Sequence, residues 1–177
     1  MLEALDNLEE IIGLSDAIMV ARGDLMVEVG AAQLPMLQKQ IISQCNRLGR
    51  PVITATQMLD SMVESPAPTR AEITDVANAV LDGSDALMLS AETASGKYPA
   101  KCVETMHEII SEVERTGDYY YGNEPEEKDF ISTAESIGGS ASLCAKSMDA
   151  AAIICLTSTG KTATYISNHR PRAHIIA

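Results

Sequence analysis

Short apolar runs alternate along the chain with segments in which apolar residues recur every three or four positions. The runs begin near residues 16, 51 and 85 and lack helical spacing, which is typical of buried strands. Helical spacing between and after them predicts helices with inward residues Leu34, Leu37, Ile41, Cys45 and Leu48, then Ile73, Val76, Ala77 and Val80, then Val103, Met106, Ile110 and Val113. The strand starts are spaced by about 35 residues, roughly one strand-plus-helix unit of an α/β barrel.

Several residues mark where these helices begin and end. Thr69 and Glu72 have the spacing of a capping box, and Pro99 suits the first position of a helix. Gly49 and Gly83 each follow a helical segment and are expected to end it. Before the first strand, Leu2, Leu5, Leu8 and Ile12 predict one further amphipathic helix.

The pattern is interrupted by a polar, turn-rich stretch at residues 117–129, which predicts a linker between a domain at 1–116 and another at 130–177. After the linker we expect a helix over about 130–148, a strand at 151–156, a loop at 157–161 and a helix at 162–169. The inward residues expected of the first helix are Ile131, Ala134, Ile137, Ala141 and either Cys144 or Met148. The last residues, 175–177, are again apolar. Because a structured domain seldom ends on such a run, we expect this domain to be truncated there.

Charge is divided unevenly along the chain. The net charge is −12, with −11 in residues 1–120 and −1 in residues 121–177. The acidic first part argues against nucleic-acid binding. From Cys155 onward there is no acidic residue, and Lys161, Arg170 and Arg172 give a local positive charge that suits a small anion.

The remaining composition points to a cytoplasmic protein that does not enter a membrane. Apolar runs are no longer than about seven residues, which is too short for a membrane span, and no signal peptide is visible. The cysteines show no close pairing and lie on expected helices or strands, so we expect buried thiols rather than metal ligands or disulfides. They are Cys45, Cys102, Cys144 and Cys155.

Candidate chemistry lies just past the carboxyl end of each predicted strand, the place where α/β barrels carry their active sites. Asp24, Thr56 and Glu92 occupy these positions. The two carboxylates could hold a divalent cation, or one could bind it while the other moves protons. Ser90 and Glu92 could form a hydrogen-bonded proton path, and Gly23 would let backbone amides approach an anion. Each could instead be a polar group that caps a helix or loop.

A second candidate is the Thr-Ser-Thr-Gly-Lys-Thr loop at 157–162, which opens a helix after a strand. A Walker loop would need glycine five positions before Gly160, but Cys155 occupies that position, so nucleotide binding is disfavoured. The alternative is an ordinary helix N-terminus capped by a hydroxyl side chain.

Several strings together resemble the pyruvate kinase family, in order and at the expected spacing. The match implies the last three βα units of a TIM (β/α)8 barrel followed by the beginning of an α/β C-terminal domain. The strings are IMVARGDL at 18–25, PVITATQML at 51–59, PTRAE at 68–72, DVANAVLDG at 75–83, MLSAET at 88–93, LTSTGKT at 156–162 and RPRA at 170–173.

The resemblance implies phosphoryl transfer from phosphoenolpyruvate to ADP, giving pyruvate and ATP, with Mg²⁺ or Mn²⁺ and usually K⁺. By motif, Asp24 would be a metal ligand, while the backbone of Ala21, Arg22, Gly23 and Asp24 and the Thr56 hydroxyl would hold the substrate carboxylate. Met19 and Met88 would line the pocket, although buried methionines are more often core residues. Ser90 and Glu92 would join Thr56 in the catalytic group, as part of the water network that delivers the proton.

The same resemblance implies two sites away from the chemistry. Thr157, Ser158, Thr159, Gly160, Lys161 and Thr162 would bind the phosphate of a sugar-phosphate effector such as fructose 1,6-bisphosphate. Arg70 and Asp75 would approach a neighbouring subunit of a homotetramer, unless they form only an intrahelical pair.

The family's catalytic lysine, first metal-binding glutamate, K⁺ ligands and lid domain have no counterpart in this sequence. We therefore expect an internal piece of a pyruvate kinase that is catalytically silent alone, because three βα units cannot close an eight-stranded barrel. Two alternatives remain: another metal-dependent barrel that handles pyruvate or its enolate, such as an aldolase, or a non-catalytic interaction protein.

Overall fold

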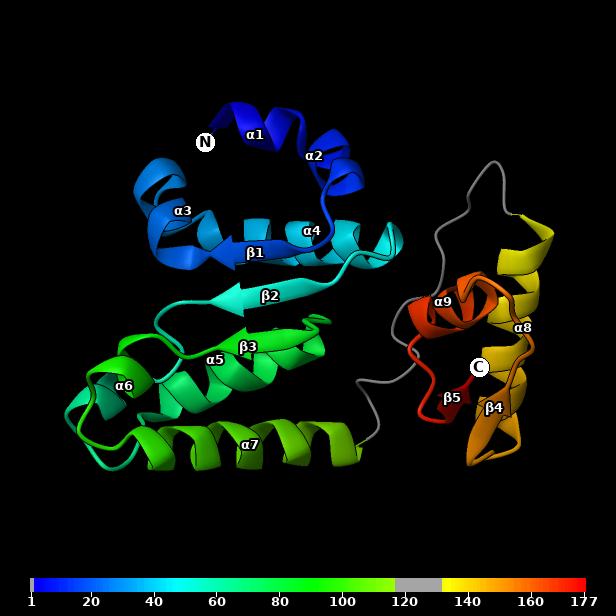
Figure 1. The fold of residues 1–177 in the computed structure, drawn as a ribbon. Coiled ribbons are helices and arrows are strands. Elements are labelled where there is room, and N and C mark those ends of the chain that lie inside the picture. The colour runs from blue at the N-terminus through cyan, green and yellow to red at the C-terminus, as the bar shows by residue number, and fades with distance from the viewer. Residues whose placement is uncertain (1, 117–131) are drawn as a thin grey trace. The chain divides into compact units, whose positions relative to one another are not determined.

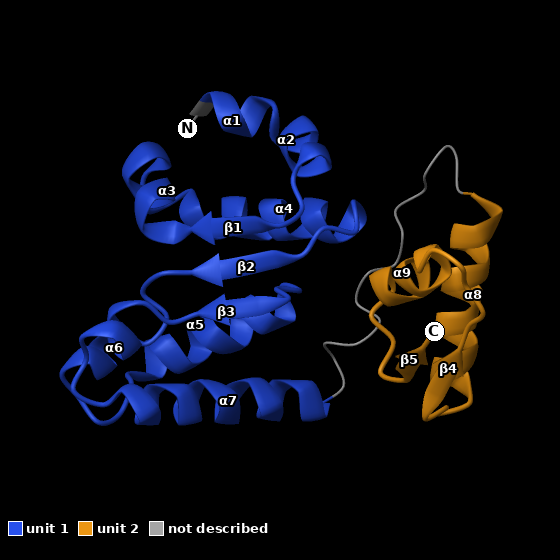
Figure 2. Cartoon of the chain, in the orientation of Figure 1, with its two compact units in different colours: residues 1–116 blue, residues 117–177 orange. Residues whose placement is uncertain are grey.

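The computed structural model describes residues 2–116 and 132–177, and the chain forms two compact units, residues 1–116 and 117–177 (Figure 2). The predicted linker at 117–129 lies outside the described residues. The elements of the first unit are α1 (Leu2–Asp6), α2 (Leu8–Leu14), β1 (Ile18–Ala21), α3 (Arg22–Val29), α4 (Leu34–Arg47), β2 (Val52–Ala55), η1 (Asp60–Val63), α5 (Arg70–Leu81), β3 (Ala86–Met88), α6 (Ala91–Ala94) and α7 (Pro99–Thr116). Those of the second are α8 (Thr133–Ser147), β4 (Ala152–Ile154), α9 (Lys161–Asn168) and β5 (His174–Ile176).

Within the described part of the first unit, three parallel strands form a sheet in the order β1-β2-β3 (Figure 1). Val20 pairs in register with Thr54, and Thr54 with Leu87, so these side chains share one face. Helices α4 and α5 cover that face (Figure 1). Met19 and Met88 therefore lie on the opposite face, and Met19 is 52% exposed.

Two apolar clusters stabilise this unit. The first joins α2, β1, α3, α4 and β2 through Ile12, Val20, Leu25, Ile41, Ile42, Cys45 and Val52. The second joins the segment after β2 to α5 and α7 through Met58, Leu59, Met62, Val76, Ala79, Cys102 and Met106. Burying each large side chain contributes about 2 kcal/mol of hydrophobic free energy.

The capping box at the start of α5 is confirmed. The Thr69 hydroxyl accepts a hydrogen bond from the Glu72 amide, and Glu72 accepts one from the Thr69 amide. Glu72 also accepts hydrogen bonds from the amide and hydroxyl of Ser61 in η1, at 2.7 and 2.6 Å. Burial raises the pKa of Glu72, but these bonds from Ser61 and Thr69 outweigh it and hold the pKa below its ordinary value.

Glycine ends α5 as expected. Gly83 has φ of 99°, and a Cβ there would collide with the Asn46 side chain, whose amide donates to the Gly83 carbonyl at 3.2 Å. The expected single helix before β1 is instead two, α1 and α2, because Asn7 leaves helical geometry and its side chain donates to the Glu3 carbonyl at 2.9 Å.

Two residues of the first unit that were predicted to face inward are exposed. Ile73 of α5 is 40% exposed and Val103 of α7 is 54% exposed. The buried face of α7 runs through the predicted Met106 together with Cys102 and Thr105. Val76 and Val80 of α5 are buried as predicted, so the apolar repeat gave both helices correctly and was wrong only at single positions of their inward faces.

Helix α8 of the second unit buries a different face from the predicted one. Gly138, Ser142 and Ala145 are buried, whereas Ile137 and Met148 are 59% and 78% exposed. A Cβ on Gly138 would lie 3.1 Å from the Tyr165 backbone, so α8 and α9 approach too closely for large side chains. In the same unit, β4 and β5 pair in parallel.

The cysteine prediction holds at three positions and is wrong at one. Cys45, Cys102 and Cys155 are buried, but Cys144 is exposed because it lies off the small-residue face of α8. Burial, and next the charge of Asp85, raises the pKa of Cys45 to about 11, so this thiol stays protonated at neutral pH. In the described part of the chain, no helix is both long and apolar enough to span a membrane.

Candidate functional site at the strand ends

The parallel register brings the carboxyl ends of β1, β2 and β3 to one edge of the sheet (Figure 1). Ala21, Ala55 and Met88 pair across this edge. Residues that follow each strand therefore lie at the same edge of the sheet.

The segment after β1 starts a helix immediately. Arg22 is the first residue of α3, so Gly23 and Asp24 lie in its first turn rather than in an extended loop. The Gly23 amide donates to Thr56 Oγ1 at 3.0 Å, which links the ends of β1 and β2. This amide is consequently already engaged, and the side chain of Asp24 is exposed to solvent.

Arg22 is 7% exposed, and its side chain crosses to the segment after β2. It donates to the carbonyl oxygens of Ala55, Thr56 and Gln57, with its closest approach 2.7 Å to that of Thr56. It also forms a two-pronged ion pair with Asp75 of α5, at 2.8 and 2.7 Å. Asp75 thus pairs with Arg22 across the fold, and not with Arg70 along the helix.

Thr56 and Gln57 form a turn with left-handed backbone geometry, at φ of 71° and 53°. Such values are uncommon for residues other than glycine and are costly for a β-branched residue such as threonine. The sequence predicted the place of Thr56 but gave no signal of this geometry.

Glu92 follows β3 and is 1% exposed. Its carboxylate accepts hydrogen bonds from the Ser90 amide at 2.7 Å and from the Leu59 amide at 3.2 Å. The donor in the bond from Ser90 is its backbone amide, so the Ser90 hydroxyl does not take part in this bond. Burial, and next the charge of Glu92, raises the pKa of the neighbouring Cys102 thiol.

The carboxylate of Asp24 is exposed at this edge, where it could meet a metal ion. Among the described residues, His, Cys, Asp and Glu side chains form no group of three or more that could hold a metal. One carboxylate nevertheless suits Mg²⁺, which keeps several waters and takes one or two carboxylates together with substrate oxygens.

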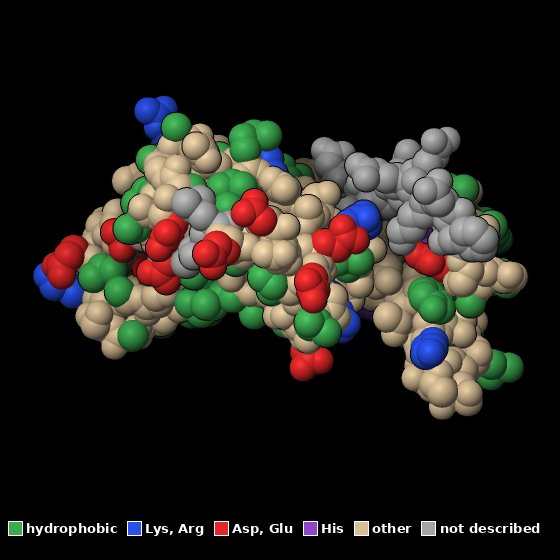
Figure 3. Space-filling view, turned by 90° about the horizontal axis from the view of Figure 1, so that it is seen from above, with side chains coloured by type: hydrophobic (Ala, Val, Ile, Leu, Met, Phe, Trp, Pro, Cys, Tyr) green, Lys and Arg blue, Asp and Glu red, His purple; other side chains and the backbone are tan. Residues whose placement is uncertain are grey.

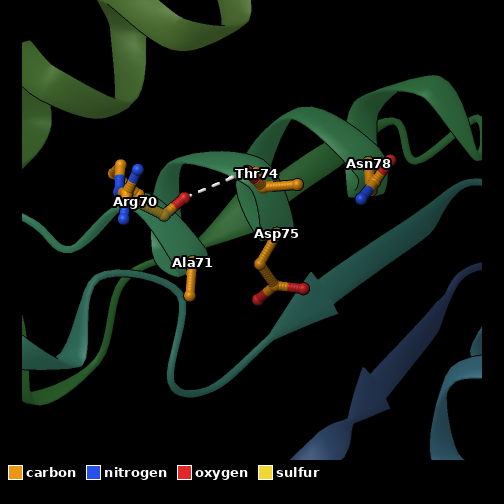
Figure 4. A pocket seen from close by; sticks show the side chains of 5 residues that line it. All are labelled: Arg70, Ala71, Thr74, Asp75 and Asn78. Carbon is orange, nitrogen blue, oxygen red and sulfur yellow. Dashed lines mark hydrogen bonds between the residues drawn. The ribbon is translucent and has the colours of Figure 1, made fainter.

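The predicted interface residues lie on an open face of α5. Arg70, Ala71, Thr74, Asp75 and Asn78 line a shallow hollow there, and Thr74 Oγ1 donates to the Arg70 carbonyl at 3.0 Å (Figure 4). Asp75 belongs both to this hollow and to the ion pair with Arg22. The face of the first unit in Figure 3 carries scattered acidic side chains, in keeping with its negative charge.

The candidate effector loop lies in the second unit. Gly160 has φ of 81°, its amide donates to Thr157 Oγ1 at 3.1 Å, and α9 begins at Lys161, one residue earlier than predicted. Lys161, Ser158 and Thr159 are exposed. The Thr157 bond stays within the loop, because it ends on the N-cap residue Gly160, and α9 has no side-chain cap of the kind that the sequence left as the alternative to phosphate binding.

Comparison with known proteins identifies both units. The family model for the pyruvate kinase barrel domain matches residues 1–103, and that for the pyruvate kinase alpha/beta domain matches residues 135–177. Pyruvate kinase of Bacillus licheniformis is 49% identical over 176 residues, which are 99% of this chain and 30% of that protein. Pyruvate kinase of Clostridium acetobutylicum is 48% identical over 181 residues and is covered to 37%.

A solved structure agrees. A crystal structure of a pyruvate kinase from Cryptosporidium parvum superposes with a TM-score of 0.85 at 43% identity, over 98% of this chain and 36% of that one. The chain thus spans about a third of the length of these relatives. The α/β fold class and the resemblance read from the sequence are confirmed, and the chain belongs to the pyruvate kinase family.

Proposed function

We propose that this chain supplies the Asp24–Thr56–Glu92 edge of a pyruvate kinase active site, for transfer of the phosphoryl group of phosphoenolpyruvate to ADP. The observation that carries the proposal is the meeting of three family motifs at one sheet edge, where the Gly23 amide and the Thr56 hydroxyl are joined. Phosphoryl transfer depends mainly on positioning and charge neutralisation, which such an edge can provide.

Asp24 would bind Mg²⁺ or Mn²⁺. When bound, the cation would neutralise charge on substrate oxygens. The exposed carboxylate at the first turn of α3 has the hard oxygen donor that this cation prefers. K⁺ would bind through residues that this sequence does not contain.

The backbone of Ala21–Asp24 and the Thr56 hydroxyl would orient the substrate carboxylate at the N-terminal end of α3. The helix dipole there favours an anion. Met19 and Met88 share the sheet face opposite α4 and α5 and would line the pocket around the methylene carbon. Ser90 and Glu92 would order the water that protonates this carbon, with Glu92 fixed by its two backbone hydrogen bonds.

The remaining assignments concern regulation and assembly. The 157–162 loop would take the phosphate of a sugar-phosphate effector, and Arg70 and Asp75 would meet another subunit of a homotetramer in the cytoplasm. Exposed Lys161 and the positive charge after Cys155 support the first assignment, and the open hollow on α5 supports the second.

The decisive experiment builds a hybrid enzyme: this chain replaces the matching 176-residue stretch of the Bacillus licheniformis enzyme. We expect the hybrid to form pyruvate from phosphoenolpyruvate, ADP and Mg²⁺, and the 177-residue chain alone to form none. A folded hybrid without activity would contradict the proposed function. Turnover by the chain alone would contradict its predicted silence, and would revive the alternative of a different, self-sufficient enzyme.

A further inference from the structure

The turn after β2 needs an external support. Thr56 and Gln57 are consecutive non-glycine residues with positive φ. Residues persist in such conformations only where the surrounding structure holds them. The turn carries the Thr56 hydroxyl, so whatever holds it also determines where that hydroxyl points.

Arg22 contacts this turn more extensively than one hydrogen bond would require. Its Nε and Nη2 atoms donate to three successive carbonyl oxygens, those of Ala55, Thr56 and Gln57, and Nη2 also lies 2.9 Å from Met58 Sδ. The guanidinium is planar with donors in a fixed fork, so one buried side chain can set the orientation of several peptide groups.

Asp75 fixes the other edge of the same guanidinium. Both of its carboxylate oxygens accept from Nη1, at 2.8 and 2.7 Å. Charge-assisted bonds of this kind are directional as well as strong. Because Asp75 lies on α5, the plane of Arg22 is tied to the helix that packs behind the sheet.

This arrangement determines the position of the Thr56 hydroxyl. It accepts from the Gly23 amide at 3.0 Å, which leaves its own O–H as a donor. The hydroxyl therefore stands beside the first turn of α3, one residue from Asp24.

We propose that Arg22, braced by Asp75, is a positioning residue that keeps the Thr56–Gln57 turn left-handed and thereby directs the Thr56 hydroxyl into the strand-end site. The proposal rests on the proposed function for the substrate that this hydroxyl meets. The effect on the turn itself is independent of that function.

The structural test uses the 177-residue chain and amide hydrogen exchange. Arg22→Lys keeps the charge but loses the fork, and we expect the Gly23 amide to exchange at least about tenfold faster, while the amides of α4 are unaffected. Arg50→Lys is the matched control, because Arg50 donates to a single carbonyl, that of Gly13, at 2.8 Å. Unchanged exchange at Gly23 in Arg22→Lys would overturn the proposal.

The kinetic test uses the hybrid enzyme and a double-mutant cycle. Arg22→Lys should lower kcat/KM by at least about tenfold, as expected when a substrate-positioning group moves by a fraction of an ångström. In the Thr56→Val background, which lacks the hydroxyl, the same change should cost less than about twofold. Equal losses in both backgrounds would contradict action through Thr56.

A rescue experiment distinguishes a positioning role of Arg22 from a role in general packing. Gln57→Gly removes the Cβ penalty of positive φ, so in the Arg22→Lys hybrid it should restore kcat/KM by about threefold or more. Absence of rescue would overturn the left-handed turn as the point of action. If the unmodified hybrid is folded but inactive, the proposed function fails, and exchange at Gly23 still decides whether Arg22 holds the turn.

Discussion

The two units of this chain pack their helices with opposite kinds of residue. In the first unit, large apolar side chains such as Ile42 and Met58 are fully buried between helices and strands. In the second, α8 meets α9 through Gly138, Ser142 and Ala145, while its larger apolar residues are exposed. The difference shows that a helix can bury either its most apolar face or its smallest one.

The units also differ in how they hold polar groups. The strand-end site of the first unit rests on two buried charged side chains, Arg22 and Glu92, that bind backbone atoms of neighbouring segments. In the second unit, the loop before α9 has a hydroxyl-to-amide bond between Thr157 and Gly160, and Lys161 is exposed. The first arrangement suits a preorganised active site, whereas the second suits a loop that adapts to a ligand.

The largest expected effect on stability comes from the large-residue core. Ile42→Ala should lower the free energy of unfolding of the first unit by about 3 kcal/mol, because Ile42 is 0% exposed and a cavity would remain. Urea unfolding of the chain, followed by circular dichroism, measures this. Leu14→Ala is the control at an 84% exposed site, and an equally large loss there would contradict the assigned core.

The small-residue face of α8 provides the next test. Gly138→Leu should destabilise the second unit by about 2 kcal/mol, since even a Cβ would lie 3.1 Å from Tyr165. Ile137→Ala, at a 59% exposed neighbour, should change it by less than about 0.5 kcal/mol. Amide exchange in α8 and α9 reports both values, and the reverse ranking would restore the face predicted from apolar periodicity.

The smallest effect concerns the capping box and its dependence on pH. The pKa of Glu72 is lowered in the folded state, so its contribution is fully present above its ordinary value of 4.5 and is lost as pH falls through the folded pKa. Glu72→Gln should cost about 1 kcal/mol at pH 7 and flatten the pH dependence of stability below about pH 4.5. Thermal unfolding between pH 3 and 7 checks this, with Glu108→Gln on the exposed side of α7 as control. Parallel curves for Glu72→Gln and the unmodified chain would contradict it.

Much of the first unit could be predicted because its signals are local. The strand runs, the capping box at Thr69 and the stop at Gly83 each depend on residues close in sequence. The position of Thr56 at a strand end followed from the same patterns. The face of α8 could not be predicted, because glycine and serine carry no apolar signal and their burial depends on how closely α9 approaches.

The contacts that organise the strand-end site could also not be predicted from the sequence. The Arg22–Asp75 ion pair joins residues 53 positions apart, and Leu59 reaches Glu92 across 33 positions. The left-handed turn at Thr56 and Gln57 contains no glycine that would have indicated it in the sequence. A lone arginine at the end of an apolar run was the one available signal that a buried partner should exist.

The measurement that tests the account most directly is the kcat of the hybrid enzyme with Asp24→Ala. Asp24 is exposed in the first turn of α3, so its loss should leave the fold intact and remove the carboxylate that we propose as the metal ligand at the strand-end edge. We predict a fall in kcat of at least about a thousandfold, corresponding to about 4 kcal/mol. Glu28→Ala, another exposed carboxylate on α3, should leave kcat within about twofold. Retention of full activity in Asp24→Ala would contradict the placement of the chemistry at this edge of the sheet.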